Sequence, residues 1–146
     1  MIADASPVGL GAVLIQIGLN GPRIIAYGNK SLTECEKRYC QTEKEALALV
    51  WAVEHFKTYL FGKEFELISD HKPLETIFGQ RSKPCARIER WVLRLQAFKY
   101  KIIYRPGKSN IADPLSRLCK THASKPFDNE NYINQIVDYS SIIKRN

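Results

Sequence analysis

The sequence has few features of a secreted or membrane protein. No apolar run is long enough to span a bilayer, and no signal peptide is recognisable, because Asp4 follows Met1-Ile2-Ala3 directly. The four cysteines among the 146 residues include no CxxC pair. We therefore expect free thiols in a reducing compartment, no association with a membrane, and an intracellular protein that is not secreted.

Zinc-binding and repeat architectures also find little support. Cys119 and His122 have a ligand-like spacing, but the other two ligands that a zinc ion needs are not evident. Internal repeats and low-complexity tracts are absent. A structural zinc domain and a repeat array are therefore not expected.

The composition is that of an ordinary globular domain. Hydrophobic residues make up 45% and charged residues 25% of the chain, and the length fits one domain that needs no disulfide. The net charge is +7, from 22 Lys and Arg against 15 Asp and Glu. This excess favours a polyanionic partner, although many basic proteins bind no nucleic acid.

The hydrophobic pattern predicts strands first and helices later. The expected elements are strands at 1–5, 11–19 and 23–30, a long helix with an irregular start at about 33–60, a strand at 65–70, helices at 73–78 and 86–98, a strand at 100–107 and a helix at 110–118. Antiparallel strands followed by β-α crossovers predict an α/β fold with a mixed sheet flanked by helices. The pattern fades beyond Leu118, and 119–146 is expected to be a linker with one marginal helix at 132–143.

Four carboxylates stand out by position. Asp70 ends a predicted strand, Asp4 lies in the first strand, and Asp113 interrupts a small apolar turn. Glu45 falls on the apolar stripe of the long helix, four residues before Leu49, where a carboxylate is costly unless something pairs with it.

Each carboxylate also has a simple structural explanation. Asp70 and Asp4 fit turns, Glu45 fits a favourable position in the first turn of a helix, and Asp113 fits an N-cap. Together, four carboxylates at element ends can bind hard cations such as Mg²⁺, and two such ions can clamp a displacement at phosphorus. Spacing alone does not establish that the four side chains converge.

Three long blocks carry a family resemblance. They read "DASPVGLGAVLIQ", "IAYGNKSLTECEKRYCQTEKEALALVWAVEHFKTYLFGKEFELISDHKPL" and "RIERWVLRLQAFKYKIIYRPGKSNIADPLSRL". In this order they resemble the ribonuclease H domain of gypsy-type LTR retrotransposon polyproteins. The resemblance covers Ile2 to Leu118, about four fifths of the chain, and it defines 1–118 as a ribonuclease H-like domain.

The resemblance implies a ribonuclease H-like fold, with a five-stranded mixed sheet, and a metal-dependent nuclease. Such a domain hydrolyses the RNA strand of an RNA–DNA hybrid during reverse transcription, with two Mg²⁺ or Mn²⁺ ions. The family's ligands fall on Asp4, Glu45, Asp70 and Asp113. By this resemblance Asp4 bridges both ions, Glu45 and Asp70 complete one site, and Asp113 holds the other.

Basic residues and one histidine are candidate substrate contacts. Arg87, Arg90 and Arg94 share one helical face, which either follows the phosphates of the DNA strand or is simply solvated. His71 is typical of the family, and both a contact with substrate and packing at the strand end remain open for it.

The chain also departs from the family pattern. Only Met1-Ile2-Ala3 precede the "DAS" motif, so we expect a truncated first strand. In addition, Pro114 follows the last carboxylate and disfavours helical geometry at Asp113. The resemblance implies a piece of a Pol polyprotein between a polymerase and an integrase, in the cytoplasm or a virus-like particle, with 119–146 as the connection towards integrase.

Two other classes of function remain. One is a catalytically inactive tether or hybrid-binding module from a decayed or domesticated element, which has no need of four carboxylates. The other is a DNA-binding regulator, which would require a recognition helix and a stronger charge bias.

Overall fold

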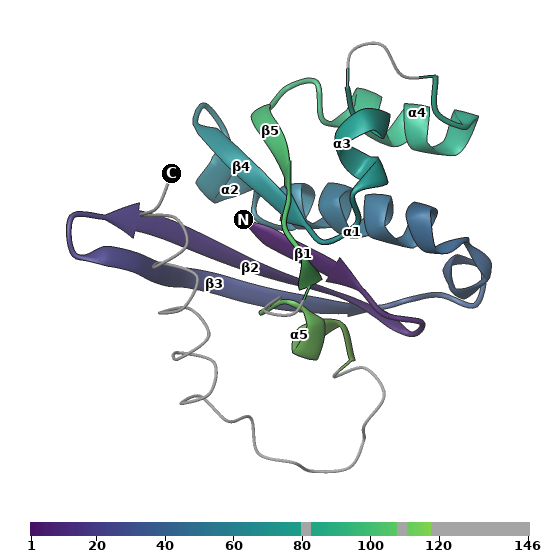
Figure 1. Cartoon of the computed structure of the whole chain (residues 1–146), viewed down its shortest axis with the longest axis horizontal. Helices are drawn as coiled ribbons and strands as arrows, with labels where there is room; N and C mark the ends of the chain where they lie inside the picture. The colour runs from purple at the N-terminus through teal and green to yellow at the C-terminus, as the bar shows by residue number, and fades with distance from the viewer. Residues whose placement is uncertain (80–82, 108–110, 118–146) are drawn as a thin grey trace.

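The computed structural model describes residues 1–79, 83–107 and 111–117, and the expected linker at 119–146, with its marginal helix, lies outside them. A five-stranded mixed sheet runs through the centre of the described part of the molecule (Figure 1). The strands are β1 (Ile2–Ala5), β2 (Gly9–Gly18), β3 (Gly21–Ser31), β4 (Glu64–Ser69) and β5 (Lys99–Tyr104). The predicted α/β fold with a mixed sheet is confirmed.

The strand order, β3-β2-β1-β4-β5, places β1 in the centre. β1 pairs antiparallel with β2 and parallel with β4, while β2–β3 is antiparallel and β4–β5 parallel. β1 has four residues, and its pairing with β2 begins at Ile2 opposite Val13. The carboxyl ends of the parallel strands β1 and β4 therefore lie side by side.

Helices cover both faces of the sheet. They are α1 (Gln41–His55), α2 (Lys57–Leu60), α3 (Pro73–Ile77), α4 (Ala86–Arg94) and α5 (Asp113–Arg117), with a short 3₁₀ turn at Glu36–Arg38. α1, α3 and α4 lie on one side and α5 on the other (Figure 1). None of the described helices has the length and apolar character needed to cross a membrane.

The helix predicted at 33–60, with an irregular start, is wrong in its continuity: its first part is a separate 3₁₀ turn, and α1 begins only at Gln41. Thr33 and Glu36 exchange hydrogen bonds, Glu36 Oε2 accepting from Thr33 N at 2.8 Å and Thr33 Oγ1 accepting from Glu36 N at 3.2 Å. This local pairing favours a separate turn, and Cys40 is extended, with ψ 162°, so that it becomes the N-cap of α1. A second break occurs at Phe56, between α1 and α2.

Two apolar clusters hold the layers together. The larger one lies between the sheet and α1, α3 and α4, and it includes the fully buried Leu49, Leu67 and Leu95. The smaller one joins Ile2 of β1 and Ile68 of β4 to Ile111, two residues before the start of α5. Because burial of each such side chain is worth about 1.5–3 kcal/mol, these clusters fix α1 and α5 against opposite faces of β1.

The cysteines that can be placed are free. Cys35, Cys40 and Cys85 are exposed thiols, which agrees with the expectation from the sequence. The suggested pair Cys119 and His122 lies outside the described residues.

Candidate active site

Three of the four predicted carboxylates converge at the carboxyl ends of β1 and β4. Asp4 lies on β1, Asp70 follows β4 directly, and Glu45 points from the first turns of α1. One oxygen from each carboxylate lies within 4.8 Å of the others. Asp4 and Glu45 are each only 4% exposed. In the chain, α1 lies between the two parallel strands β1 and β4, and its first turns carry Glu45 to the adjacent ends of these strands.

Burial opposes the ionisation of two of these carboxylates, Asp4 and Glu45. Desolvation raises the pKa of Asp4 to about 7, with further increases from the charges of Asp113 and Asp70. Desolvation also raises the pKa of Glu45 to about 8, and Asp4 and Asp70 add to that increase. Buried carboxylates of like charge need a compensating positive charge to ionise at neutral pH.

The surroundings of the two carboxylate oxygens of Glu45 indicate where a compensating positive charge fits. Glu45 Oε1 accepts a hydrogen bond from Gln41 Nε2 at 2.5 Å. Its buried Oε2 has no hydrogen-bond partner in the described part of the chain. A buried carboxylate oxygen without a donor, beside two more carboxylates, fits a hard divalent cation with oxygen ligands.

Ser116 holds the central carboxylate. Its Oγ donates to Asp4 Oδ2 at 2.8 Å, and its carbonyl oxygen accepts from Ser6 Oγ at 2.6 Å. Ser116 is fully buried. These bonds tie α5 to β1 across 112 residues of sequence. The sequence analysis did not identify Gln41 or Ser116 as site residues. For Ser116, the only available signal was its position three residues after Asp113.

Asp113 lies close to this group but outside it. Its Oδ1 accepts from Arg117 Nε at 2.8 Å, and its side chain is 43% exposed. The sequence suggested that Pro114 would disfavour helical geometry at Asp113. In the structure α5 nevertheless begins at Asp113, because a proline in the first turn breaks no hydrogen bond of the helix. The role of Asp113 as a fourth ligand remains a prediction.

Gly107 packs against the Asp70 carboxyl group. A Cβ at position 107 would lie 3.2 Å from both Cβ and Cγ of Asp70 and would contact Oδ2 even more closely. With any larger residue at position 107, either the Asp70 carboxylate or the backbone at 107 would have to move. Glycine is therefore needed for the chain after β5 to pass beside the site.

His71 is tied to the start of α1. Its Nε2 lies 2.9 Å from Thr42 Oγ1, and its backbone N–H donates to Ser69 Oγ at 3.2 Å. This arrangement fits the packing alternative, since it joins the end of β4 to the helix that carries Glu45. A contact between His71 and substrate remains a prediction.

The three predicted arginines differ in their surroundings. Arg87 forms an ion pair with Glu43 at 2.6 Å and stacks over the ring of Tyr39. Arg94 makes two hydrogen bonds to Glu54, at 2.7 and 2.5 Å. Arg90 is exposed and has no ion pair among the described residues. Two of the three arginines on this face of α4 are therefore already paired with glutamates of α1, and Arg90 is the one that is not.

Comparison with known proteins identifies the family. The family described as the RNase H-like domain found in reverse transcriptase matches residues 1–98. The chain belongs to this family. The resemblance found in the sequence is therefore confirmed.

Relatives from transposons support the same assignment. The chain is 42% identical over 119 residues to the retrovirus-related Pol polyprotein from transposon 297 of Drosophila melanogaster, covering 81% of this chain and 11% of the relative. It is 38% identical over 119 residues to the Pol polyprotein from transposon gypsy of the same species, with 80% and 11% covered. The chain thus spans about a tenth of the length of these relatives.

Solved structures share the fold. RNase H1 from the halophilic archaeon Halobacterium salinarum superposes with a TM-score of 0.65 at 24% identity, covering 84% of this chain and 96% of that one. LC11-RNase H1 in complex with an RNA/DNA hybrid gives a TM-score of 0.58 at 16% identity, with 77% and 88% covered. The RNase H-like fold predicted from the sequence is confirmed.

Proposed function

We propose that this RNase H-like domain hydrolyses the RNA strand of RNA–DNA hybrids in a divalent-metal-dependent reaction during reverse transcription. The observation that carries the proposal is the convergence of Asp4, Glu45 and Asp70, with a buried oxygen of Glu45 that has no donor in the described chain. An inactive tether would gain nothing from three carboxylates at the junction of strand and helix, where burial raises the pKa of Asp4 and of Glu45 and so opposes the ionisation of these two.

The residues fit Mg²⁺ or Mn²⁺, two ions per site in the proposal. Asp4 is proposed to contact both, Glu45 and Asp70 to complete one site, and Asp113 to hold the other. A divalent ion held by these carboxylates would supply an acidified water and positive charge beside the scissile phosphate. The chain itself positions the ligands: Ser116 orients Asp4, Gln41 orients Glu45, and the contact with Gly107 restricts Asp70.

The partner and context follow the family. The solved RNase H1 that was bound to an RNA/DNA hybrid has the same fold, which supports a hybrid as ligand here. Polymerase and integrase segments of a Pol polyprotein are proposed neighbours, because the similar relatives are Pol polyproteins about nine times longer than the region that matches. An intracellular location, in the cytoplasm or a virus-like particle, is part of the same proposal.

The test is cleavage of a hybrid labelled on its RNA strand. We expect cleavage by the 146-residue chain in Mg²⁺ or Mn²⁺, no cleavage in EDTA, and no cleavage of the same RNA as a single strand. Gel analysis of the labelled products gives the answer directly. A folded chain that binds the hybrid but leaves it intact at every metal concentration would instead support the tether.

Arg90 is expected to contribute most of the phosphate contact of α4. In Arg90→Gln, the dissociation constant for the hybrid should rise and the slope of log K against log salt should fall by about 0.7–0.9, the value for one lost phosphate contact. Arg87→Gln and Arg94→Gln serve as matched controls, because their guanidinium groups are paired with Glu43 and Glu54. Equal losses of affinity in all three variants would instead show that the three arginines contribute alike, as the sequence suggested for their shared helical face.

A further inference from the structure

The contacts of α5 with β1 determine where Asp113 lies relative to the other carboxylates. Ser116 Oγ lies 2.8 Å from Asp4 Oδ2 and 2.8 Å from the carbonyl oxygen of Asp113. One buried hydroxyl group therefore joins the carboxylate of Asp4 to the backbone of Asp113. The backbone of Asp113 is thus held beside the cluster, while its side chain is 43% exposed and has room to change direction.

The side chain of Asp113 already has a cation as its partner. Its Oδ1 accepts a hydrogen bond from Arg117 Nε at 2.8 Å, one helical turn further along α5. Among the described residues, the carboxylates with oxygens within 4.8 Å of one another are Asp4, Glu45 and Asp70, without Asp113. An oxygen that is proposed to bind a divalent ion is therefore bonded to a guanidinium group of this chain.

The charge of Arg117 also acts on Asp4. Burial is the main cause that raises the pKa of Asp4; the charge of Asp113 raises it further, and the charge of Arg117 lowers it. In return, the hydrogen bond and the charge of Asp113 raise the pKa of Arg117, and the charge of Asp4 adds to that increase. The guanidinium group of Arg117 therefore supplies positive charge on the side of the cluster where Asp113 lies.

The pair of Asp113 and Arg117 is of a kind that a divalent ion can displace. Both side chains are accessible to water, at 43% for Asp113 and 56% for Arg117, and they lie four residues apart on one short helix. Such pairs are weak because water screens them. A divalent cation that also contacts Asp4 is a stronger partner for Asp113, and a nearby guanidinium group repels that cation.

We propose that Arg117 is a built-in competitor of the second metal ion, which holds Asp113 while that ion is absent and releases it when Asp113 becomes a ligand. This competition makes the second site weaker than the site of Asp4, Glu45 and Asp70, and it sets the concentration of divalent ion at which the second site fills. The inference rests on the proposed function, in which Asp113 holds the second ion. Arg117 is a positioning residue, because it acts through Asp113.

The test is a titration of the 146-residue chain with Mn²⁺ at about pH 8, in which electron paramagnetic resonance measures the free ion. The original chain should bind one ion more tightly than a second. In Arg117→Gln, the dissociation constant of the weaker site should fall about three- to tenfold, because a competing and repelling charge is removed. The dissociation constant of the tighter site should change by less than about twofold.

A second measurement follows the hydrogen bond itself. The NMR signal of the Arg117 Nε–H group, which donates to Asp113 in the metal-free chain, should shift as Mg²⁺ fills the weaker site. It should approach the position that it has in Asp113→Asn, where the charge-assisted bond is absent. A signal that stays unchanged while the weaker site fills would show that Arg117 keeps Asp113 throughout, and would overturn the proposal.

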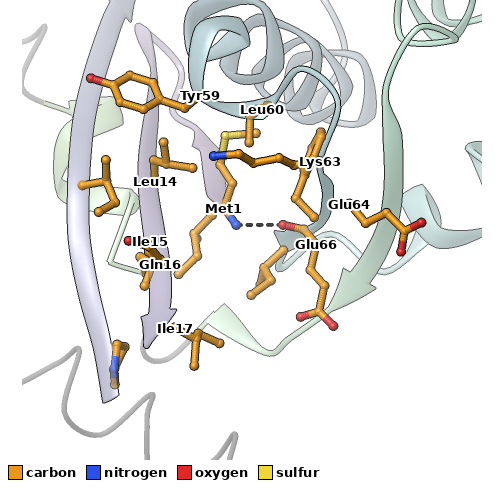
Figure 2. Close-up of a pocket in the computed structure, with 15 residues that line it drawn as sticks. Met1, Leu14, Ile15, Gln16, Ile17, Tyr59, Leu60, Lys63, Glu64 and Glu66 are labelled. Atoms are coloured by element: carbon orange, nitrogen blue, oxygen red, sulfur yellow. Dashed lines mark hydrogen bonds between the residues drawn. The ribbon is translucent and has the colours of Figure 1, made fainter. Parts of the chain in front are cut away.

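Lys63→Gln is the matched control for net charge. Lys63 directly precedes β4 and Asp70 directly follows it, so that the six residues of the strand separate them by about 20 Å. Figure 2 shows Lys63 near Met1, among the side chains that line a cavity of about 390 Å³. This variant should leave both affinities for Mn²⁺ unchanged. Equal gains of affinity in Lys63→Gln and Arg117→Gln would reduce the effect to net charge and overturn the proposal.

Asp113→Asn and the double variant Asp113→Asn/Arg117→Gln distinguish this inference from the proposed function. Asp113→Asn should abolish the weaker site, and Arg117→Gln should then have no further effect. Loss of the weaker site in Asp113→Asn, together with unchanged or weaker binding in Arg117→Gln, would overturn the competition and leave Asp113 as a ligand. Unchanged binding in Asp113→Asn would overturn both the competition and the assignment of Asp113. None of these measurements depends on cleavage of a hybrid.

Discussion

Asp70→Asn is expected to abolish cleavage of the RNA strand while leaving the fold intact. The substitution removes one negative charge at nearly constant shape from a group with one oxygen within 4.8 Å of an oxygen of Asp4 and of Glu45. A metal ion contributes several kcal/mol to stabilising the charge of the transition state, and each 1.36 kcal/mol is a factor of ten in rate. The rate should therefore fall by about a thousandfold or more in the labelled-hybrid assay.

The control for this variant is Glu89→Gln. It makes the same change of charge at an exposed position of α4 that has no ion pair among the described residues. Circular dichroism should show both variants folded, and Mn²⁺ titration should show weakened binding in Asp70→Asn alone. Cleavage by Asp70→Asn at more than about a tenth of the original rate would exclude Asp70 as a ligand in this reaction.

The ends of the parallel strands explain why much of the site could be predicted from the sequence. Asp4 and Asp70 stood out because each lies at or near the end of an apolar, β-rich segment, and Glu45 because it occupies a buried helical position. These are local patterns, and the family resemblance joined them into one site. The structure then brings the three together as a consequence of the β-α crossover.

The supporting contacts could not be predicted in this way, because they join residues far apart in the chain. Ser116 bonds to Asp4 across 112 residues, and Gly107 contacts Asp70 after the turn that ends β5. Likewise, the helical periodicity of α4 placed its arginines on one face, but their ion pairs depend on Glu43 and Glu54 of α1. Local periodicity specifies a face of a helix and carries no information about the element packed against it.

The start of α1 shows a related limit. Helical spacing was correct for the buried stripe around Leu49, yet it extended the helix back to Thr33. The hydrogen bonds between Thr33 and Glu36 and the extended backbone at Cys40 separate this segment. Side chains that bond to the local backbone compete with helix formation, and apolar periodicity does not register that competition.

Without divalent metal, the site is expected to make the fold less stable as the pH rises from about 5 to 8. The folded-state pKa values are about 7 for Asp4 and about 8 for Glu45, above their ordinary values of 3.8 and 4.5. The folded state therefore binds protons more tightly, so this contribution to the free energy of unfolding is complete below about pH 4 and is lost as the pH rises through 7 and 8. Mg²⁺ should offset the loss by pairing with the ionised carboxylates, and raise Tm more at pH 8 than at pH 5.

Glu45→Gln isolates this effect from the rest of the chain. The amino group of Met1 works in the opposite direction, since its lowered pKa of about 6 adds stability as the pH rises, but it is common to both proteins. In EDTA, Tm of the original chain should fall relative to the variant by several degrees between pH 5 and 8, because about 1 kcal/mol corresponds to roughly 2–4 °C or more at this size. The variant should also lose most of the increase in Tm that Mg²⁺ produces at pH 8. Parallel Tm curves for the two proteins, with and without Mg²⁺, would show that Glu45 neither titrates at the site nor binds the ion.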